Sequence, residues 1–319
     1  MRNISLILAA AVTFSGGAIA QTYPSSPVKL VVGFTPGGAV DAATRAFAER
    51  LSSRLGQNVL VENRPGASEI LAAQFVAKSR PDGHTLLIST DAPFTSNQFM
   101  YRNLGYNPNA DFTAIGILMT SPLVLATSPK FPATNYKEFL SAVRGDSRGP
   151  RIGTTGGGVQ TAMGYLAHNE GFAWENVLYK GVPASMPDLI ESRLDAVLGS
   201  PPVMAPFIIN GRIKGLAVAG DTRLKILPDL PSFKELGIKD AGARFLVTLS
   251  GPAGLPKPIV DQLSKAVSEI VMDPSFQKRH LDDLGMTATV SSPREFAEHI
   301  EKERIVQRER IAKFGPKME

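Results

Sequence analysis

The chain has 319 residues, of which 34 are basic and 29 acidic, so its formal net charge is only +5. It has no cysteine, which excludes disulfides, thiol chemistry and lipid attachment at a cysteine. It also lacks a clustered basic stripe with interleaved aromatic residues, which excludes an ordinary nucleic-acid-binding surface. The hydrophobic fraction of 43% is ample for real cores, and the length predicts about two domains.

The N-terminus has the pattern of a secretory leader. Arg2 gives a positive start, residues 4–14 are a short apolar segment, and residues 18–20 (Ala-Ile-Ala) form a small-residue cleavage pattern. We therefore predict a signal peptide over residues 1–20, the alternative being an ordinary N-terminal helix. No later segment approaches ~18 uninterrupted apolar residues. These features predict export to a Gram-negative periplasm without a membrane or lipid anchor.

The stretch from Val28 to Arg45 predicts a strand, a glycine turn and a helix. An apolar run is followed by Gly37 and Gly38, and then by Asp41, where a helix begins. Such a turn directs unpaired backbone N–H groups and the positive end of the helix dipole to one point, which attracts a carboxylate or phosphate. The spacing matches neither a dinucleotide fingerprint nor a P-loop. A turn that only connects two elements therefore remains an open alternative.

Strands and helices continue to alternate, which predicts parallel sheets with right-handed crossovers and ligand binding beyond the carboxyl ends of the strands. Further strands are expected over residues 59–61, 85–89, 112–127 (interrupted at Pro122), 151–155, 177–180, 195–198, 214–219 and 245–250. Helices are expected over residues 42–55, 70–79, 136–143, 159–168, 187–193, 204–210, 259–272, 274–284 and 293–314.

The chain is expected to cross into a second α/β lobe near Pro122 and to return near Phe245. This places residues 21–122 and 246–319 in the first lobe and residues 123–245 in the second. The second lobe repeats the strand, glycines and helix pattern at residues 151–168. Two helix N-termini, after Gly38 and after Gly158, are therefore expected to face each other across a cleft.

Several stretches in order and spacing resemble the Bug family, the extracytoplasmic receptors of tripartite tricarboxylate transporters. The motifs are residues 27–41 (PVKLVVGFTPGGAVD), 61–67 (VENRPGA), 81–87 (PDGHTLL), 179–181 (YKG), 211–218 (GRIKGLAV) and 251–256 (GPAGLP). The resemblance implies a type II-like periplasmic binding protein, with two parallel-sheet α/β lobes joined by a hinge. It implies a monomer without cofactor or metal that closes on a small carboxylate or amino-acid-like ligand and delivers it to membrane transporter subunits.

The resemblance also implies the site, in which turns bind a ligand carboxylate largely through backbone amides and ordered water. Carried over to this sequence, the ligand-binding residues are Phe34, Gly37, Gly38, Ala39, Asp41, Ala67, Ser68, Glu69, Ser89, Thr90, Thr154, Thr155, Gly158, Thr161 and Ser200.

Three stretches depart from the family pattern. Residues 39–40 are Ala-Val where a small hydroxyl usually precedes the Asp, residues 68–69 are Ser-Glu where glycines are usual, and residues 200–202 are Ser-Pro-Pro in place of a polar segment. Glu69 allows two hypotheses. It points to solvent and complements its helix dipole, or it faces the cleft, repels a second carboxylate by roughly 4 kcal/mol at ~4 Å, and selects a ligand with a cationic part.

Enzyme chemistry has little support in the residues. No G-x-S-x-G elbow or H-E-x-x-H motif occurs, and the four histidines lie in a turn, on helical patterns or in a charged segment. Asp41 is better suited to capping a helix than to acting as a base. The alternatives are an orphan periplasmic ligand sensor, a small hydrolase, or a structural protein that binds no small molecule.

Overall fold

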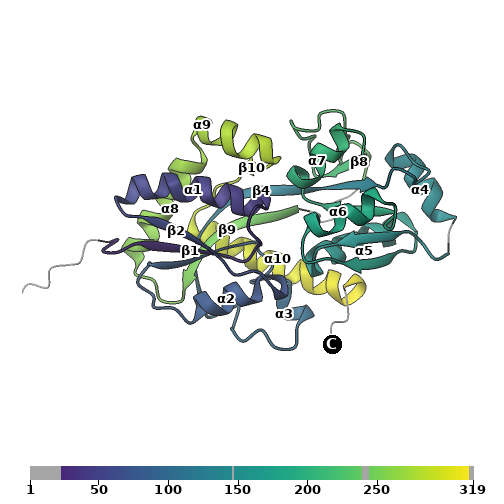
Figure 1. The fold of residues 1–319 in the computed structure, drawn as a ribbon. Helices are drawn as coiled ribbons and strands as arrows, with labels where there is room; N and C mark the ends of the chain where they lie inside the picture. The colour runs from purple at the N-terminus through teal and green to yellow at the C-terminus, as the bar shows by residue number, and fades with distance from the viewer. Residues whose placement is uncertain (1–22, 146, 239–243, 316–319) are drawn as a thin grey trace, which may run out of the picture.

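A computed structural model describes residues 23–145, 147–238 and 244–315. The described chain forms two lobes side by side, each with helices on both faces of a sheet (Figure 1). The strands are connected in the order β2-β1-β3-β9-β4-β7-β5-β6, and β8 and β10 also pair with β4. The predicted signal peptide lies outside the described residues.

The first lobe contains most of the N-terminal and C-terminal elements. Its strands are β1 (Val28–Val32), β2 (Val59–Asn63), β3 (Thr85–Ser89), β9 (Arg244–Pro252), β10 (Thr287–Ala288) and the first part of β4 (Phe112–Thr127). Its helices and helical turns are α1 (Ala39–Leu55), η1 (Ala67–Glu69), α2 (Ile70–Ala77), α3 (Asn97–Met100), α8 (Lys257–Val271), α9 (Pro274–Phe276), η2 (Gln277–Leu281), η3 (Asp282–Leu284) and α10 (Pro293–Phe314).

The second lobe is built around the other end of β4. Its further strands are β5 (Arg151–Thr154), β6 (Glu175–Leu178), β7 (Ala196–Gly199) and β8 (Lys214–Ala219). Its helices are α4 (Tyr136–Arg144), α5 (Gly157–Glu170), α6 (Val182–Ile190) and α7 (Pro201–Ile209).

The alternation of side chains along each strand supplies separate cores on the two faces of each sheet. In β1, Leu30 packs with residues of α1 and α8, whereas Val31 packs with residues of α2 and α10. In the second part of β4, Leu125 packs with α4 and α5, whereas Val124 packs with α6 and α7. Both sheets are therefore covered on both faces, which leaves the strand ends as the open edges of each lobe.

The predicted parallel pairs are confirmed within each lobe. β1 is parallel to β2 and β3, and β5 is parallel to β6 and β7. Two strands depart from that pattern, since β9 is antiparallel to β3 and β4, and β4 is antiparallel to β7 and β8. The sheets are therefore mixed, and β4 runs from one lobe into the other (Figure 1).

Pro122 does not interrupt β4, so that prediction is wrong. Pro122 is opposite Arg244 at the start of β9, and the next residue, Leu123, is opposite Ala219 of β8. Pro122 thus lies where β4 changes its partner strand, so its missing N–H removes no hydrogen bond from the regular pairing between strands.

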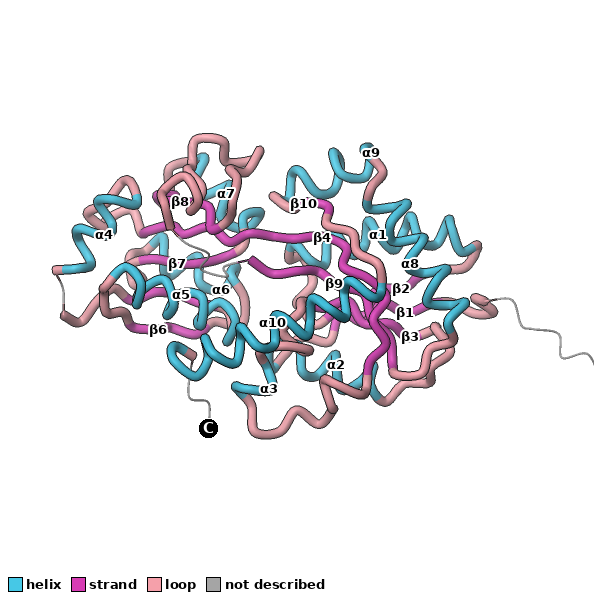
Figure 2. The backbone as a smooth tube through the Cα atoms, turned by 180° about the vertical axis from the view of Figure 1, so that it is seen from behind, coloured by secondary structure: helices cyan, strands magenta, loops and turns pink. Residues whose placement is uncertain are grey.

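The long helix α10 contacts both lobes (Figure 2). Near its start, Phe296 and Ile300 are buried in the core beneath the first sheet. At its end, the ring of Phe314 lies 5.7 Å from that of Tyr165 and 4.8 Å from that of His168, both on α5. The periodicity of residues 293–314 predicts the bounds of this helix correctly, but not that it bridges two lobes.

Two predicted helices differ from those observed. α6 begins at Val182 rather than at Pro187, because Pro183 already occupies the first turn, where a missing N–H costs no hydrogen bond. The helix predicted over 274–284 is instead a succession of the short turns α9, η2 and η3. Among the described residues, no helix combines the length and the hydrophobicity needed to cross a bilayer.

Candidate functional site

The turns that follow β1, β2 and β3 meet at one edge of the first sheet, as predicted. Asn63, at the end of β2, donates a hydrogen bond from Nδ2 to the backbone oxygen of Phe34 (3.0 Å). Thr90, just after β3, donates from its backbone N–H to the carboxylate of Glu69 (2.7 Å). The polar loops of three strands are therefore tied directly to one another.

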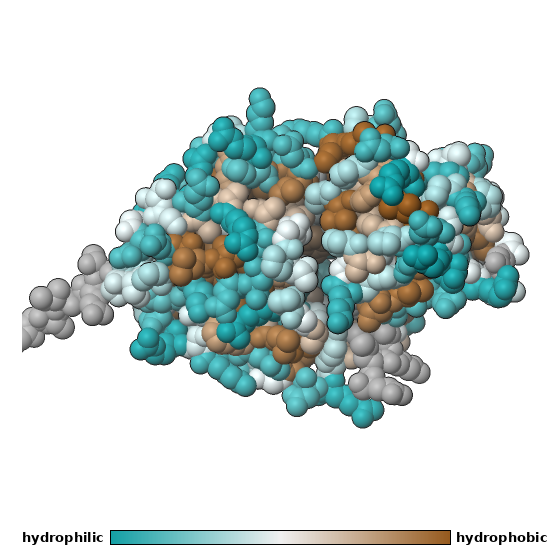
Figure 3. Space-filling view, viewed as in Figure 1, coloured by the Kyte–Doolittle hydropathy of each residue, from teal (hydrophilic) through white to brown (hydrophobic). Residues whose placement is uncertain are grey.

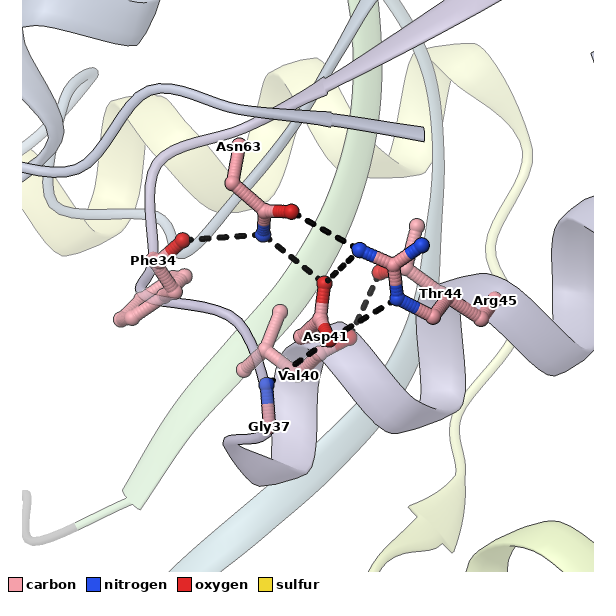
Figure 4. A network of polar contacts seen from close by, with 7 residues as sticks. All are labelled: Phe34, Gly37, Val40, Asp41, Thr44, Arg45 and Asn63. Atoms are coloured by element: carbon pink, nitrogen blue, oxygen red, sulfur yellow. Dashed lines mark hydrogen bonds and ion pairs between the residues drawn. The ribbon is translucent and has the colours of Figure 1, made fainter. Parts of the chain in front are cut away.

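Asp41 is the centre of the first of these loops (Figure 4). Helix α1 begins at Ala39, two residues earlier than predicted, so Asp41 lies in its first turn, with its side chain only 4% exposed. Its carboxylate accepts hydrogen bonds from the backbone N–H of Gly37 (2.9 Å), from Arg45 Nε (3.0 Å) and from Asn63 Nδ2 (2.8 Å). Asp41 therefore fixes the glycine turn to both α1 and β2.

These bonds also decide the ionisation of Asp41. Burial by itself raises the pKa of the carboxyl group, but the hydrogen bonds from Arg45, Gly37 and Asn63 outweigh burial and hold the pKa below its ordinary value. Asp41 is thus a stable anion whose oxygens already have partners. The Asp41 carboxylate therefore holds the turn at Gly37 and Gly38 in place.

The second loop has an unusual backbone. Ala67, Ser68 and Glu69 have φ values of 47°, 51° and 71°, so three successive L-residues adopt the left-handed region that glycine favours. Asn97 Nδ2 donates to the backbone oxygen of Ser68 (2.8 Å), and the Ser68 hydroxyl lies 2.7 Å from that of Tyr101. The strained turn is therefore held by Asn97 of α3 and by Tyr101, the residue after α3. The sequence around these two residues shows no periodicity, so it did not indicate a role in the site.

Glu69 does not point to solvent, so the first hypothesis about it is wrong. Its exposure is 6%, and its carboxylate accepts hydrogen bonds from both the backbone N–H and the hydroxyl of Thr90. A Cβ on Gly33 would lie 2.8 Å from the Glu69 Cβ, so the side chain lies against the end of β1. Burial raises the pKa of Glu69 to about 8, although the bonds from Thr90 oppose the shift.

In the second lobe, two of the predicted threonines, Thr154 and Thr161, make hydrogen bonds within the protein. Thr154 donates from Oγ1 to Asn176 Oδ1 (2.6 Å), and Thr161 donates from Oγ1 to the backbone oxygen of Gly157 (2.7 Å), with both residues buried. By contrast, Gly158 is exposed, and Thr155 and Ser200 are partly exposed. The accessible groups at this edge are therefore mainly the backbone N–H groups of the first turn of α5.

The other predicted residues form the rest of the first-lobe edge. Ser89 is fully buried, with its hydroxyl 3.5 Å from that of Thr248, and Ala39 is buried at the start of α1. Gly37 and Ala67 are exposed at the tips of their turns, and Gly38 lies partly exposed just before α1.

The two lobes touch where the second loop faces α5. The Ser68 hydroxyl lies 3.3 Å from the position that a Cβ on Gly156 would occupy. A Cβ on Gly157 would overlap the Sδ and Cε atoms of Met100, which follows the second loop in the first lobe. Figure 3 shows the molecular surface hollowed between the two lobes. Sequence reasoning missed Met100, because the packing of one lobe on the other leaves no local pattern.

The residues weighed for enzyme chemistry do not assemble into a cluster. His84 lies in a turn, with Nδ1 3.3 Å from the carboxylate of Asp82. Within the part of the chain that the structure describes, no group of three or more His, Asp or Glu side chains is placed to hold a metal ion.

Comparison with known proteins gives the family. The model of the tripartite tricarboxylate transporter family receptor matches residues 43–315. A protein of Agrobacterium vitis from the ttuE-ttuC' intergenic region is 32% identical over 87% of this chain and 81% of its own length. BugT of Bordetella pertussis is 27% identical over 86% of this chain and 85% of its own length.

Solved structures agree with the sequence relatives. Rpa4515 of R. palustris, solved with adipate, is 30% identical with a TM-score of 0.85, covering 91% of this chain and 98% of that one. The periplasmic binding protein BugD is 29% identical with a TM-score of 0.81 over the same shares. MatC of Rhodopseudomonas palustris, with bound malate, is 27% identical with a TM-score of 0.79, covering 91% of this chain and 100% of that one. This chain therefore belongs to the receptor family of tripartite tricarboxylate transporters, has the periplasmic-binding-protein fold, and is a solute-binding receptor.

Proposed function

We propose that this receptor captures a small carboxylated solute between its lobes in the periplasm and delivers it unchanged to the membrane subunits of a tripartite tricarboxylate-type transporter. It acts as a monomer, exported by the signal peptide predicted over residues 1–20. The lobes are residues 21–122 with 246–319 and residues 123–245, and they hinge through β4 and β9. The observation that carries this proposal is the close approach of the first lobe to the start of α5, where Ser68 lies beside Gly156 and Met100 lies beside Gly157.

The chemistry of the two edges favours an anion. Helix α5 has 14 residues, and the N–H groups of its first turn, with the positive end of its dipole, face the first lobe. Across from it lies the turn at Ser68, whose hydroxyl is beside Gly156. A carboxylated solute that contacts both edges binds the closed arrangement better than the open one, so it drives closure. Adipate and malate, bound to two structural relatives, are solutes of this class.

Calorimetry of the mature chain with adipate, malate, aspartate and glutamate tests the proposal. We expect one ligand per chain for at least one of these acids. We also expect a melting temperature that rises at saturation, since a ligand at 100 times its Kd adds about 2.7 kcal/mol to the free energy of unfolding. The ligand recovered afterwards should be chemically intact.

Other outcomes favour other functions. Consumption of the ligand would indicate the hydrolase alternative. The absence of saturable binding to any of the acids would contradict capture of a carboxylate. Binding without transporter-dependent uptake in cells that carry the transporter genes would indicate the orphan sensor.

Valine at Gly38 or Gly158 should remove binding without unfolding the protein. A Cβ on Gly158 meets no atom within 4 Å, and one on Gly38 meets only the backbone oxygen of Thr35 at 3.7 Å. The added side chains therefore fit the protein but occupy the space beside the N–H groups that the ligand needs. We expect the affinity to fall at least ~10-fold, or about 1.4 kcal/mol, with a melting temperature close to that of the parent. Unchanged affinity in both variants would contradict this location of the site.

A further inference from the structure

We propose that Glu69 takes up a proton when a carboxylate ligand binds between the lobes, so that capture depends on pH. The inference rests on the proposed function, in which backbone N–H groups bind the anion and Glu69 has no direct part. It assigns to Glu69 a role that comes from its position in the floor of the site.

Glu69 lies where the ligand must approach. Its side chain packs against Gly33, the residue after β1, and bonds to Thr90, the residue after β3. The preceding residue, Ser68, is the one that faces Gly156 across the lobes. The carboxyl group is thus set between the carboxyl ends of two parallel strands, the usual binding edge of an α/β sheet.

The carboxyl group is held there and cannot turn aside when an anion arrives. Both of its oxygens accept hydrogen bonds from Thr90. The backbone of its turn is fixed by the bond from Asn97 to the oxygen of Ser68. Turning the side chain outward would leave the buried N–H of Thr90 without its acceptor. An incoming anion must therefore be accommodated by a change of ionisation.

The groups around Glu69 include no compensating cation. Thr90 and Asn97 have uncharged side chains, and the nearby acid Asp91, whose own pKa burial raises to about 7, disfavours a second negative charge. The hydroxyl of Tyr106 also stays neutral, because burial raises its pKa. In the described ranges, no Lys or Arg is placed in an ion pair with Glu69. A carboxylate ligand brings a further negative charge, and so it stabilises the protonated form of Glu69.

The sign of the pH effect follows from this arrangement. Binding raises the pKa of Glu69 above its value in the free protein, which burial already raises to about 8. Below that value Glu69 is already neutral, and binding takes up few protons. Above it, binding takes up as much as one proton, and the affinity falls by up to ~10-fold for each further pH unit.

Calorimetry with adipate or malate in buffers of different ionisation enthalpy measures the uptake directly. Both acids are fully ionised above about pH 7, so they release or take up no protons themselves. We expect the number of protons taken up on binding to increase between about pH 7 and about pH 9 and to approach one at the upper end of that range. No uptake by the parent protein at about pH 9 overturns the inference, while binding itself would leave the proposed function standing.

Variants at Glu69 and Asp91 test whether Glu69 is the group that takes up the proton. Glu69→Gln keeps the size of the side chain and an acceptor for the Thr90 N–H, so it should bind with no uptake and an affinity independent of pH. If that variant does not fold, Glu69→Gly serves in its place, because glycine accepts a φ of 71° without strain. Asp91→Asn is the matched control and must retain the uptake. Uptake that persists without Glu69, or that disappears with Asp91→Asn, overturns the assignment. Failure of the parent protein to bind any carboxylate at about pH 7 would instead contradict the proposed function.

Discussion

Gly157→Val is expected to weaken carboxylate binding by about 5-fold or more while leaving the melting temperature of the ligand-free protein nearly unchanged. A side chain at this position overlaps Met100 of the opposite lobe. Overpacking of this kind costs about 1–3 kcal/mol, and here it is imposed only when the lobes come together. The fraction of molecules in the closed state, which is the state that binds, decreases by the factor that this free-energy cost implies. The apparent affinity decreases by the same factor. Calorimetry together with thermal melts separates the two effects.

The overlap can also be removed by shortening Met100, the side chain of the first lobe that the valine meets. Met100→Ala, added to Gly157→Val, shortens the side chain that the valine meets and should restore most of the lost affinity. Met100→Ala alone reports the cost of the cavity that it leaves in the first lobe, because Met100 is only 3% exposed. A double variant that binds no better than Gly157→Val would show that the contact between the lobes is not the cause.

Of the substitutions proposed for this receptor, Asp41→Ala should lower the free energy of unfolding most. It leaves the N–H of Gly37 without its acceptor, removes one of the two acceptors of Asn63 Nδ2, and removes the ion pair with Arg45. Since the Arg45 side chain is 50% exposed, the pair itself contributes modestly, and most of the effect comes from the partly buried hydrogen bonds with Gly37 and Asn63. We expect a loss of about 3 kcal/mol and a melting temperature lower by about 5–10 °C.

Arg45→Ala is the matched control, expected to cost about 1 kcal/mol or less. The pH dependence gives a second check. Because the pKa of Asp41 is lowered in the folded protein, its stabilisation is complete above the ordinary Asp value of about 3.9 and is lost as the pH falls through the lower folded value. The difference in stability between the parent and Asp41→Ala should therefore shrink below about pH 4. A constant difference across that range would contradict the role given to the carboxylate.

Local signals in the sequence predicted the features that depend on local structure. The bounds of α10 follow from the periodicity of residues 293–314. The meeting of the three loops follows from parallel pairing. The antiparallel pairing of β9 was not predictable, because an apolar run that is buried on both faces reads the same in either direction.

The candidate site was predictable as a set of turns but not in its side chains. The carboxylate of Asp41 accepts a hydrogen bond from Asn63, which is 22 residues further along the chain. At that separation a single sequence gives no sign that two residues are in contact. The sequence could not decide between the two hypotheses for Glu69, because three left-handed L-residues contradict local preference and are held by bonds that involve Thr90 and Asn97. The buried hydroxyls of Thr154 and Thr161 brace their own lobe, a role that composition cannot distinguish from contact with a solute.

The continuity of β4 limits how such a receptor can be rearranged by recombination. Residues at its start pair with β9 and residues at its end pair with β7 and β8, so one uninterrupted strand is an integral part of both sheets. Neither lobe can be excised as an autonomous module, since each would lose an interior strand together with the apolar surface that the strand covers. Chimeras between relatives should consequently fold only when β4 and all of its neighbouring strands come from the same parent.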